Sequence, residues 1–313
     1  MVEVEIGVME AGKKIHRYVR QLLPGVPLSG IHKMIRTGRV KVNGKKAKPD
    51  DLIQLGDKVC LYIAEEDYKE VSKSPRKYGG VRRDIEVIYE DGDVLIVNKP
   101  AGLLTHGDKE EQKDTLVNRV LAYLYHKNEL QEQVFTPAPA NRLDRNTSGI
   151  VVFGKTGPAI RSLTADISDH LMGKWYLALV QGLVKSAGEI DSKLTRDVQR
   201  NRTVVAESGK EAVTRYEPKA AAGRTTVVKI QLIHGRTHQI RAHFQSIGHP
   251  LVGVVKYGGQ KQLADEMEHQ WLHAAFLEFP DGRRFAAPLP EEFRQHLLNL
   301  GYSELAIKKI QEF

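Results

Sequence analysis

Helical and alternating patterns of hydrophobic residues divide the chain into a short amino-terminal segment and a longer carboxy-terminal one. In the first segment, apolar residues at helical spacing predict a helix over 15–22. A second helix follows, with Ser29 as its N-cap and its end at Gly38. An alternating run at 39–44 predicts a strand that closes on an Asn-Gly turn, and 59–63 predicts another strand.

Strand patterns dominate the longer segment, where they follow one another more often than they alternate with helices. Two apolar runs flank the Asp-Gly dipeptide at 91–92, which predicts a hairpin over 85–98. Further strands are predicted at 149–154, 174–181, 203–206, 211–216, 225–233 and 271–279. Helices are predicted at 114–126, 158–171, 237–247 and 291–299, with Thr237 as the expected N-cap of the third. This order predicts an α+β fold with a mixed, mostly antiparallel sheet.

A polar stretch separates the two segments. Residues 65–83 contain serines, a proline and a Gly-Gly pair, a composition typical of a linker. The chain has 313 residues, more than the roughly 100–200 residues of a typical single domain. We therefore expect an amino-terminal domain over 1–64, a linker over 65–83 and a second domain over 84–313.

Composition restricts the class of protein. No apolar run approaches the roughly 18 residues that a membrane helix needs. The sequence begins without the basic start and apolar stretch of a secretory signal. The single cysteine, Cys60, cannot form an internal disulfide and is expected to be a small buried hydrophobic residue. These features predict a cytoplasmic protein with no membrane partner.

Positive charge is concentrated in the amino-terminal segment. The whole chain has a formal net charge of +8, whereas residues 11–49 alone contain eleven Lys or Arg and no acidic residue. Such clustering indicates a polyanionic partner, and nucleic acid is the commonest one. A solvated basic face without a ligand is one alternative. An anionic membrane surface is another, which the short folded segments and the lack of an adjacent lipid anchor disfavour.

The amino-terminal pattern resembles a known RNA-binding domain. Its two helices with basic outer faces, its strands and the run Arg-Thr-Gly-Arg-Val-Lys-Val-Asn-Gly at 36–44 are similar to the alpha-L domain of a small-subunit ribosomal protein and many RNA-modifying enzymes. The resemblance implies that basic residues of this domain contact RNA phosphates. The residues expected to do so are Lys13, Arg17, Arg20, Lys33, Arg36, Arg39, Lys41 and Lys45.

A candidate catalytic acid stands in the second segment, between a Pro-rich loop and an apolar strand. Asp144 is flanked by Arg142 and Arg145 and is followed by Asn-Thr-Ser-Gly. Neighbouring arginines can hold such a carboxylate ionised on a rigid loop. For an isolated Asp, an Asx-turn with surface ion pairs would be the simpler interpretation.

The whole string at 141–149, Asn-Arg-Leu-Asp-Arg-Asn-Thr-Ser-Gly, resembles the His-Arg-Leu-Asp-x-x-Thr-Ser-Gly catalytic motif of the RluA family of pseudouridine synthases. Further stretches match motifs of this family in the same order, at 97–102, 174–180 and 235–243. The resemblance covers residues 84 to about 290 and, with the amino-terminal domain, is greatest to the RluC type. The chain departs from the family pattern with Asn141 in place of His and Val254 in place of Asp.

The resemblance implies a pseudouridine synthase fold for the second domain and a set of site residues. Asp144 is expected to act as the catalytic carboxylate, Arg241 to pair with it and Tyr176 to pack on the target base. Substrate contacts are expected from Arg142, Leu143, Thr147, His238 and Ile240. In this family the motif arginine, here Arg142, fills the gap that the flipped uridine leaves in the RNA.

The implied reaction needs no cofactor. Isomerisation of uridine to pseudouridine breaks the N1–C1′ bond, rotates the uracil and rejoins it through C5, so nothing is oxidised and no group is donated. The reaction requires an ionised carboxylate close to the sugar or the base. No metal is expected either, because the four histidines between Gln231 and Tyr257 lie near arginines and without any Asp, Glu or Cys.

The sequence thus predicts an RNA pseudouridine synthase for structured RNA, with large-subunit ribosomal RNA as the expected substrate and no obligate protein partner. A non-catalytic RNA-binding or ribosome-assembly factor on the same fold is the alternative, and the departures at Asn141 and Val254 would be its signs. A metal-dependent nuclease is a further alternative, which the missing carboxylate cluster disfavours.

Overall fold

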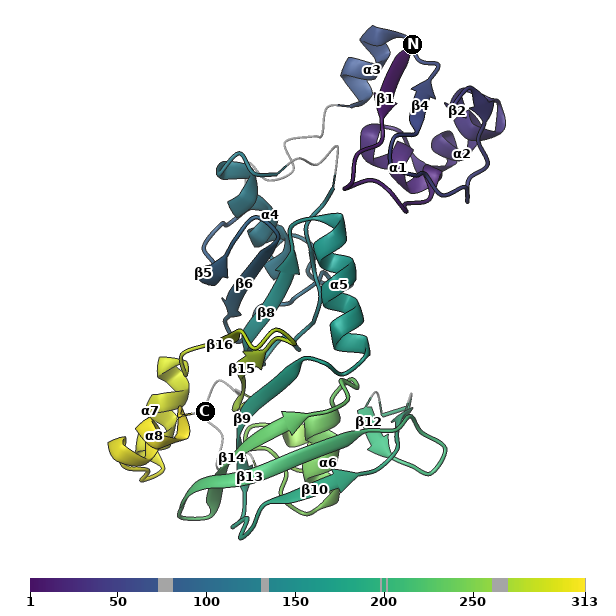
Figure 1. Ribbon diagram of the computed structural model, residues 1–313. Helices are drawn as coiled ribbons and strands as arrows, with labels where there is room; N and C mark the ends of the chain where they lie inside the picture. The colour runs from purple at the N-terminus through teal and green to yellow at the C-terminus, as the bar shows by residue number, and fades with distance from the viewer. Residues whose placement is uncertain (73–80, 131–134, 198, 201, 261–269, 313) are drawn as a thin grey trace.

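The computed structural model describes residues 1–72, 81–130, 135–197, 199–200, 202–260 and 270–312. Its strands form a four-stranded sheet, a ten-stranded sheet and a separate two-stranded sheet. Figure 1 shows the four-stranded sheet with its helices at one end of the molecule and the long sheet extending away from it. The predicted α+β class is confirmed.

The amino-terminal sheet consists of β1 (Val2–Glu5), β2 (Val40–Val42), β3 (Lys45–Lys46) and β4 (Lys58–Leu61). Its order is β1-β4-β2-β3, and each neighbouring pair is antiparallel. Helices α1 (Ile15–Leu22) and α2 (Leu28–Arg36) share one apolar core with it. The predicted turn joins β2 to β3, with positive φ at Asn43 (49°) and Gly44 (76°). Both predicted helices and the turn are confirmed, whereas β1 was not predicted.

The predicted N-cap of α2 is wrong. The helix begins at Leu28, and Pro27 occupies the N-cap position with φ −63° and ψ 154°. Ser29 lies inside the first turn, and no side chain of the described residues caps this end. Proline fixes φ near the helical value and brings no amide hydrogen, so the chain enters the helix directly after it.

Helix α3 (Glu65–Val71) lies where the sequence predicts the start of a linker. Tyr68 and Val71 pack against the amino-terminal core, and the carbonyl of Val71 accepts a hydrogen bond of 2.9 Å from the Gly25 amide. Residues 65–71 are therefore helical rather than extended, because two apolar residues one turn apart anchor an otherwise polar segment. Residues 73–80 of the predicted linker lie outside the described residues.

The long sheet is built from β5 (Glu86–Glu90), β6 (Val94–Lys99), β7 (Ala138–Pro139), β8 (Ser148–Gly154), β9 (Gly173–Gln181), β10 (Gly188–Asp191), β13 (Val213–Ala222), β14 (Thr225–Leu232), β15 (Leu272–Glu278) and β16 (Arg284–Ala286). The strands follow the order β10-β13-β14-β9-β15-β8-β6-β5, with β7 beside β8 and β16 beside β15. Among the described strands, β15 and β8 pair in parallel and their other neighbours are antiparallel. The predicted mostly antiparallel sheet is confirmed.

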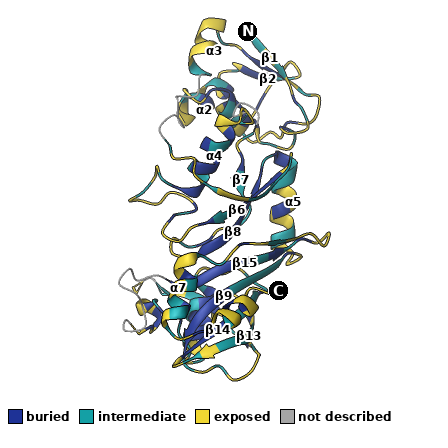
Figure 2. Cartoon of the chain, turned by 90° about the vertical axis from the view of Figure 1, so that its left-hand side faces the viewer, coloured by how far each residue is buried: buried dark blue, intermediate teal, exposed yellow. Residues whose placement is uncertain are grey.

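Helices cover both faces of this sheet: α4 (Leu116–His126), α5 (Gly157–Ser168), α6 (Gln239–Ser246), α7 (Glu291–Asn299) and α8 (Glu304–Ile310). On β8, Val151 and Phe153 pack with α4, whereas Ile150 and Val152 pack with α5. On β9, Ala178 and Val180 pack with α6, whereas Leu177 and Leu179 pack with α7 and α8. Figure 2 shows these central strands buried. Burial on both faces explains why β8 is a continuous apolar run rather than an alternation.

The remaining elements are short. Strands β11 (Leu194–Asp197) and β12 (Arg202–Val205) form the two-stranded sheet, and a 3-10 turn, η1, spans Val255–Tyr257. The sequence did not predict β10, β11, β16 or α8. None of the described helices combines the length and apolar character needed to cross a lipid bilayer.

Gly149 lies where the loop that carries Asp144 becomes β8. Its φ is +113°, and a Cβ at this position would lie 2.2 Å from the carbonyl oxygen of Ala274 in β15. We expect Gly149→Ala to lower the free energy of unfolding by about 2 kcal/mol or more, because it strains the backbone and collides with β15. Urea denaturation measures this loss.

Gly92→Ala is the control for this prediction. Gly92 lies in the β5–β6 turn, and a Cβ there would have no atom within 4 Å. Its free energy of unfolding should change by no more than about 0.5 kcal/mol. Equal losses in the two variants would show that close packing at Gly149 does not stabilise the fold.

Candidate active site

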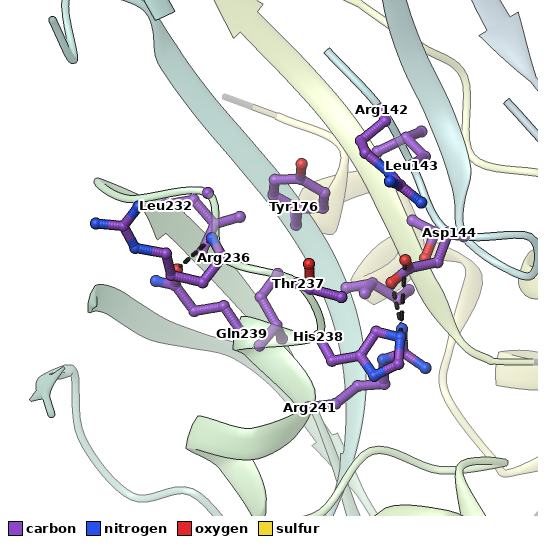
Figure 3. Close-up of a pocket in the computed structure, with 14 residues that line it drawn as sticks. Arg142, Leu143, Asp144, Tyr176, Leu232, Arg236, Thr237, His238, Gln239 and Arg241 are labelled. Atoms are coloured by element: carbon purple, nitrogen blue, oxygen red, sulfur yellow. Dashed lines mark hydrogen bonds and ion pairs between the residues drawn. The ribbon is translucent and has the colours of Figure 1, made fainter. Parts of the chain in front are cut away.

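A cavity of about 110 Å³ lies where the loop before β8, strand β9 and the turn before α6 meet (Figure 3). Asp144, Tyr176 and Arg241 line this cavity. The predicted substrate-contact residues also line it: Arg142, Leu143, Thr147, His238 and Ile240. The structure therefore gathers in one place every residue that the second domain was expected to contribute to the site.

An ion pair between Asp144 and Arg241 forms part of the cavity wall (Figure 3). Nη2 of Arg241 donates a hydrogen bond to Oδ2 of Asp144, although the two residues are 97 positions apart in the sequence. The side chain of Arg241 is 12% exposed and that of Asp144 is 30% exposed. Because water reaches the pair only partly, the attraction between the two charges is screened less than it would be on the surface.

Side-chain hydrogen bonds hold the loop on both sides of Asp144. The Thr105 hydroxyl donates to the carbonyl of Leu143 at 2.9 Å and accepts from the Leu143 amide at 3.2 Å. Three residues after Asp144, the hydroxyl of Thr147 accepts a hydrogen bond of 2.8 Å from the side-chain amide of Gln270. These bonds fix the direction in which the Asp144 side chain leaves the loop.

Lys99 is a supporting residue that the sequence analysis did not single out. It is fully buried, and its Nζ donates to the carbonyls of Pro100 (2.8 Å), Leu103 (2.7 Å) and Arg145 (3.0 Å). Burial lowers the pKa of Lys99 to about 7, and the nearby negative charge of Asp144 opposes this shift. Its place in the motif at 97–102 was the signal that could have identified it.

Tyr176 is contributed by β9 and lies between the Asp144 loop and the turn that leads into α6 (Figure 3). Its ring packs against two apolar clusters of this domain, one around α6 and one around α4. Burial raises the pKa of the Tyr176 hydroxyl, and the negative charge of Asp144 raises it further. The hydroxyl therefore remains protonated at neutral pH and can act as a donor.

His238 occupies the N-cap position of α6 in the left-handed conformation, with φ 57°. The predicted cap at Thr237 is wrong, because the chain turns sharply at His238 and the Gln239 side chain accepts the Arg236 amide at 3.0 Å instead. Nδ1 of His238 lies 2.8 Å from the Tyr257 hydroxyl, and Nε2 lies 3.9 Å from Oδ1 of Asp144. Burial and the charge of Arg241 lower the pKa of His238 to about 4, so the ring is neutral at pH 7.

The other histidines of this region have structural partners. The contacts are between His234 and the Val213 amide, between His243 and the hydroxyls of Ser192 and Thr214, and between His249 and the Gln181 carbonyl. In the part of the chain that the structure describes, no three His, Cys, Asp or Glu side chains gather in a way that could hold a metal ion.

The two departures from the family pattern lie away from the cavity. Nδ2 of Asn141 donates to the Ile150 carbonyl at 3.1 Å, and its Oδ1 accepts from the Val152 amide at 2.9 Å. Asn141 therefore ties the loop to β8. Val254 is buried in the apolar cluster around α6. Neither residue lines the cavity that holds Asp144.

The basic residues predicted to contact RNA lie on the amino-terminal domain. Most are exposed, namely Arg17, Arg20, Lys33, Arg36, Arg39 and Lys45. Lys41 is half-buried, with Nζ 4.9 Å from the ring centre of Tyr62. Lys13 is also half-buried, with Nζ 5.3 Å from the ring centre of Phe135 in the second domain. Lys13 therefore contributes to a contact between the two parts of the chain.

Comparisons with known proteins agree with this geometry. The RNA pseudouridylate synthase family matches residues 93–246, and the S4 domain matches residues 13–59. A solved human structure, RNA Pseudouridylate Synthase Domain Containing 4, superposes with a TM-score of 0.58 at 20% identity, covering 69% of this chain and 92% of the human one. This likeness shows that the second domain has the pseudouridine synthase fold.

Two curated relatives match over almost the whole chain. Ribosomal large subunit pseudouridine synthase D of Pseudomonas aeruginosa is 33% identical, covering 90% of each chain. Ribosomal large subunit pseudouridine synthase C of Escherichia coli is also 33% identical, covering 95% of this chain and 96% of the relative. The chain therefore belongs to the RluA family of RNA pseudouridine synthases, as its motifs predict, and is an isomerase.

Proposed function

We propose that this RNA pseudouridine synthase acts on large-subunit ribosomal RNA and that Asp144 is its catalytic carboxylate. The observation that carries the assignment of Asp144 is its ion pair with Arg241, inside a cavity that Tyr176 also lines. The choice of substrate rests on two relatives named as ribosomal large subunit pseudouridine synthases. The match covers 90% of this chain for synthase D and 95% for synthase C.

The target uridine would leave the RNA stack to reach this cavity, at a cost of roughly a few kcal/mol. Arg142 is exposed on the same loop, two residues before Asp144, so its guanidinium can occupy the place of the extruded base. Leu143 and Ile240 are buried and would form the apolar part of the cavity wall around the uracil. Thr147 is buried beside Gln270 and keeps the loop in position.

The reaction breaks N1–C1′, forms C5–C1′, releases the C5 proton and adds a proton at N1, so the atoms balance without another reactant. Asp144, held in place by its ion pair with Arg241, would stabilise or bond an electron-poor carbon of the sugar or base. Tyr176 would pack on the uracil, and its protonated hydroxyl would donate to the rotating base. The neutral His238 would complete the binding edge next to Asp144.

The amino-terminal domain would dock the RNA. Helices α1 and α2 carry exposed basic side chains, namely Arg17, Arg20, Lys33 and Arg36. Phosphate contacts of this kind give affinity and placement rather than sequence reading. We assign residues 1–64 with α3 to this docking domain and 84–313 to catalysis. The enzyme would act in the cytoplasm, where a buried free thiol such as Cys60 stays reduced.

No observation favours the non-catalytic assembly factor. Such a factor would not need a half-buried carboxylate, because an unused charge in that position lowers stability. The cavity instead keeps Asp144, Arg241 and Tyr176 together.

Asp144→Asn should abolish isomerisation and leave RNA affinity nearly unchanged. The substitution keeps the shape of the side chain and removes its charge, so we expect turnover to fall by about a thousandfold or more. Tritium release from RNA labelled at uridine C5 measures turnover without requiring knowledge of the target uridine. Asp169→Asn, at an exposed carboxylate after α5, is the matched control and should behave as wild type. Activity of Asp144→Asn within tenfold of wild type would refute the assignment.

Arg241→Met should lower turnover by about a hundredfold, because the carboxylate of Asp144 loses the cation beside it. Methionine keeps most of the buried length of the side chain, so the variant should fold. Arg224→Met removes an exposed arginine from the β13–β14 turn and should leave turnover unchanged. Wild-type turnover in Arg241→Met would mean that the ion pair does not assist the reaction.

The docking proposal predicts how RNA affinity depends on salt. Four exposed basic residues of α1 and α2 are changed to Gln, namely Arg17, Arg20, Lys33 and Arg36. Each lost phosphate contact should reduce the slope of log affinity against log salt by roughly one unit, while turnover at saturating RNA is retained. Lys308→Gln with Lys309→Gln, on α8, is the control. Equal slopes for all three proteins would show that α1 and α2 form a solvated face only.

A further inference from the structure

The two ring nitrogens of His238 face different groups. The position of the ring hydrogen decides whether His238 presents a hydrogen-bond donor or a lone pair to Asp144. Nδ1 lies 2.8 Å from the Tyr257 hydroxyl, whereas Nε2 lies 3.9 Å from Oδ1 of Asp144. A hydrogen on Nε2 would attract the carboxylate, and a lone pair on Nε2 would repel it. The tautomer of His238 is therefore part of the electrostatics of the site.

Tyr257 determines this tautomer. Its side chain is fully buried, and its hydroxyl oxygen accepts a hydrogen bond of 2.8 Å from the Thr203 amide. An amide N–H cannot accept in return, so the hydroxyl hydrogen needs an acceptor elsewhere. Within the described residues, the other partner of this hydroxyl is Nδ1 of His238. The phenol therefore donates to Nδ1, and the ring hydrogen lies on Nε2, facing Asp144.

The same tyrosine also supports Arg241. The guanidinium carbon of Arg241 lies 5.6 Å from the ring centre of Tyr257, within the range of a cation–π contact. The His238 ring meets the Tyr257 ring edge to face, with centroids 5.8 Å apart and planes at 84°. One buried side chain therefore touches both of the groups that approach the carboxylate of Asp144.

The position of Tyr257 is itself anchored. It ends the η1 turn, and its hydroxyl bond to Thr203 connects it to β12. The Thr203 hydroxyl donates in turn to the Thr237 carbonyl at 2.9 Å, directly before His238. Tyr257 and His238 are therefore fixed relative to each other by bonds from the same residue of β12.

We propose that Tyr257 is a positioning residue of the isomerisation, whose hydroxyl holds His238 as the Nε2–H tautomer and whose ring supports Arg241, so that both present hydrogen-bond donors to Asp144. The proposal rests on the proposed catalytic role of Asp144. A neutral imidazole supplies a donor without placing a second full positive charge beside Arg241. The opposite tautomer would turn a lone pair toward Oδ1 and weaken the hold on the carboxylate.

The first test uses the unaltered full-length chain. Labelling with 15N-histidine and recording two-bond 15N–1H correlation spectra at neutral pH distinguishes the two neutral tautomers. The signals of His238 are those lost in His238→Gln. We expect a single Nε2–H form. An Nδ1–H form, or a mixture, would overturn the proposal without reference to activity.

The second test is Tyr257→Phe, which keeps the ring beneath Arg241 and removes the hydroxyl. We expect the tautomers of His238 to mix and the single-turnover rate at saturating RNA to fall by about tenfold to a hundredfold. The affinity for RNA should change by about twofold at most, because no RNA contact is lost. Tyr302→Phe is the matched control, since it removes a buried hydroxyl 3.0 Å from Thr225 Oγ1. Its rate and its His238 tautomer should equal those of wild type.

The outcomes separate this proposal from the proposed function. A wild-type rate together with a single tautomer in Tyr257→Phe would reduce Tyr257 to a packing residue and end the proposal. Retained activity in Asp144→Asn would instead end the role of Asp144, whatever the spectra of His238 show. If Tyr257→Phe does not fold, the spectrum of the unaltered chain decides.

Discussion

The pairing of Asp144 with Arg241 is the interaction on which the rest of the site depends. Each charge is partly removed from water, so either one alone would be held at a considerable cost in free energy. The order of the long sheet makes the pairing possible. Strands β15 and β9 lie between β8 and β14, so the loop that enters β8 and the helix that follows β14 face each other across two buried strands. The covered, two-faced sheet is therefore what allows an ion pair between residues 97 positions apart to keep one geometry.

A fixed carboxylate also requires a fixed loop. In this loop, backbone carbonyls point into the protein and accept hydrogen bonds from buried side chains. Backbone carbonyls in loops ordinarily face water, because an unpaired carbonyl in the interior is costly. Here Thr105 satisfies the carbonyl of Leu143, and Lys99 satisfies that of Arg145. Burial acts against the charge on Lys99, whereas three carbonyl acceptors and the negative charge of Asp144 favour it. Arg241 thus stabilises Asp144 by direct contact, and Lys99 does so through the backbone that carries the carboxylate.

The parts of the structure that could be predicted are those that local pattern determines. Strand β8 is apolar at nearly every position because both of its faces are covered, and the alignment of motifs identified the residues of the cavity. Both wrong N-caps, at Ser29 and Thr237, have backbone causes: Pro27 sets the entry to α2, and His238 adopts a positive φ before α6. Helix α3 and the short strands gain their stability from distant segments, which a local pattern does not record. The contacts of Tyr257 likewise exist only once β12, η1 and α6 have come together.

The departure at Asn141 shows which property that position needs. Its amide nitrogen donates to the Ile150 carbonyl while its oxygen accepts from the Val152 amide, so it continues the hydrogen-bonding edge of β8 where the loop begins. A donor and an acceptor side by side meet this need, and a group that titrates is not required. A histidine could supply one donor and one acceptor as well, but only in one neutral tautomer. Asn141 lies three residues before Asp144, and among the described residues its side-chain hydrogen bonds go to β8. The exchange of His for Asn therefore changes how the loop is anchored and leaves the charges around the carboxylate as they are.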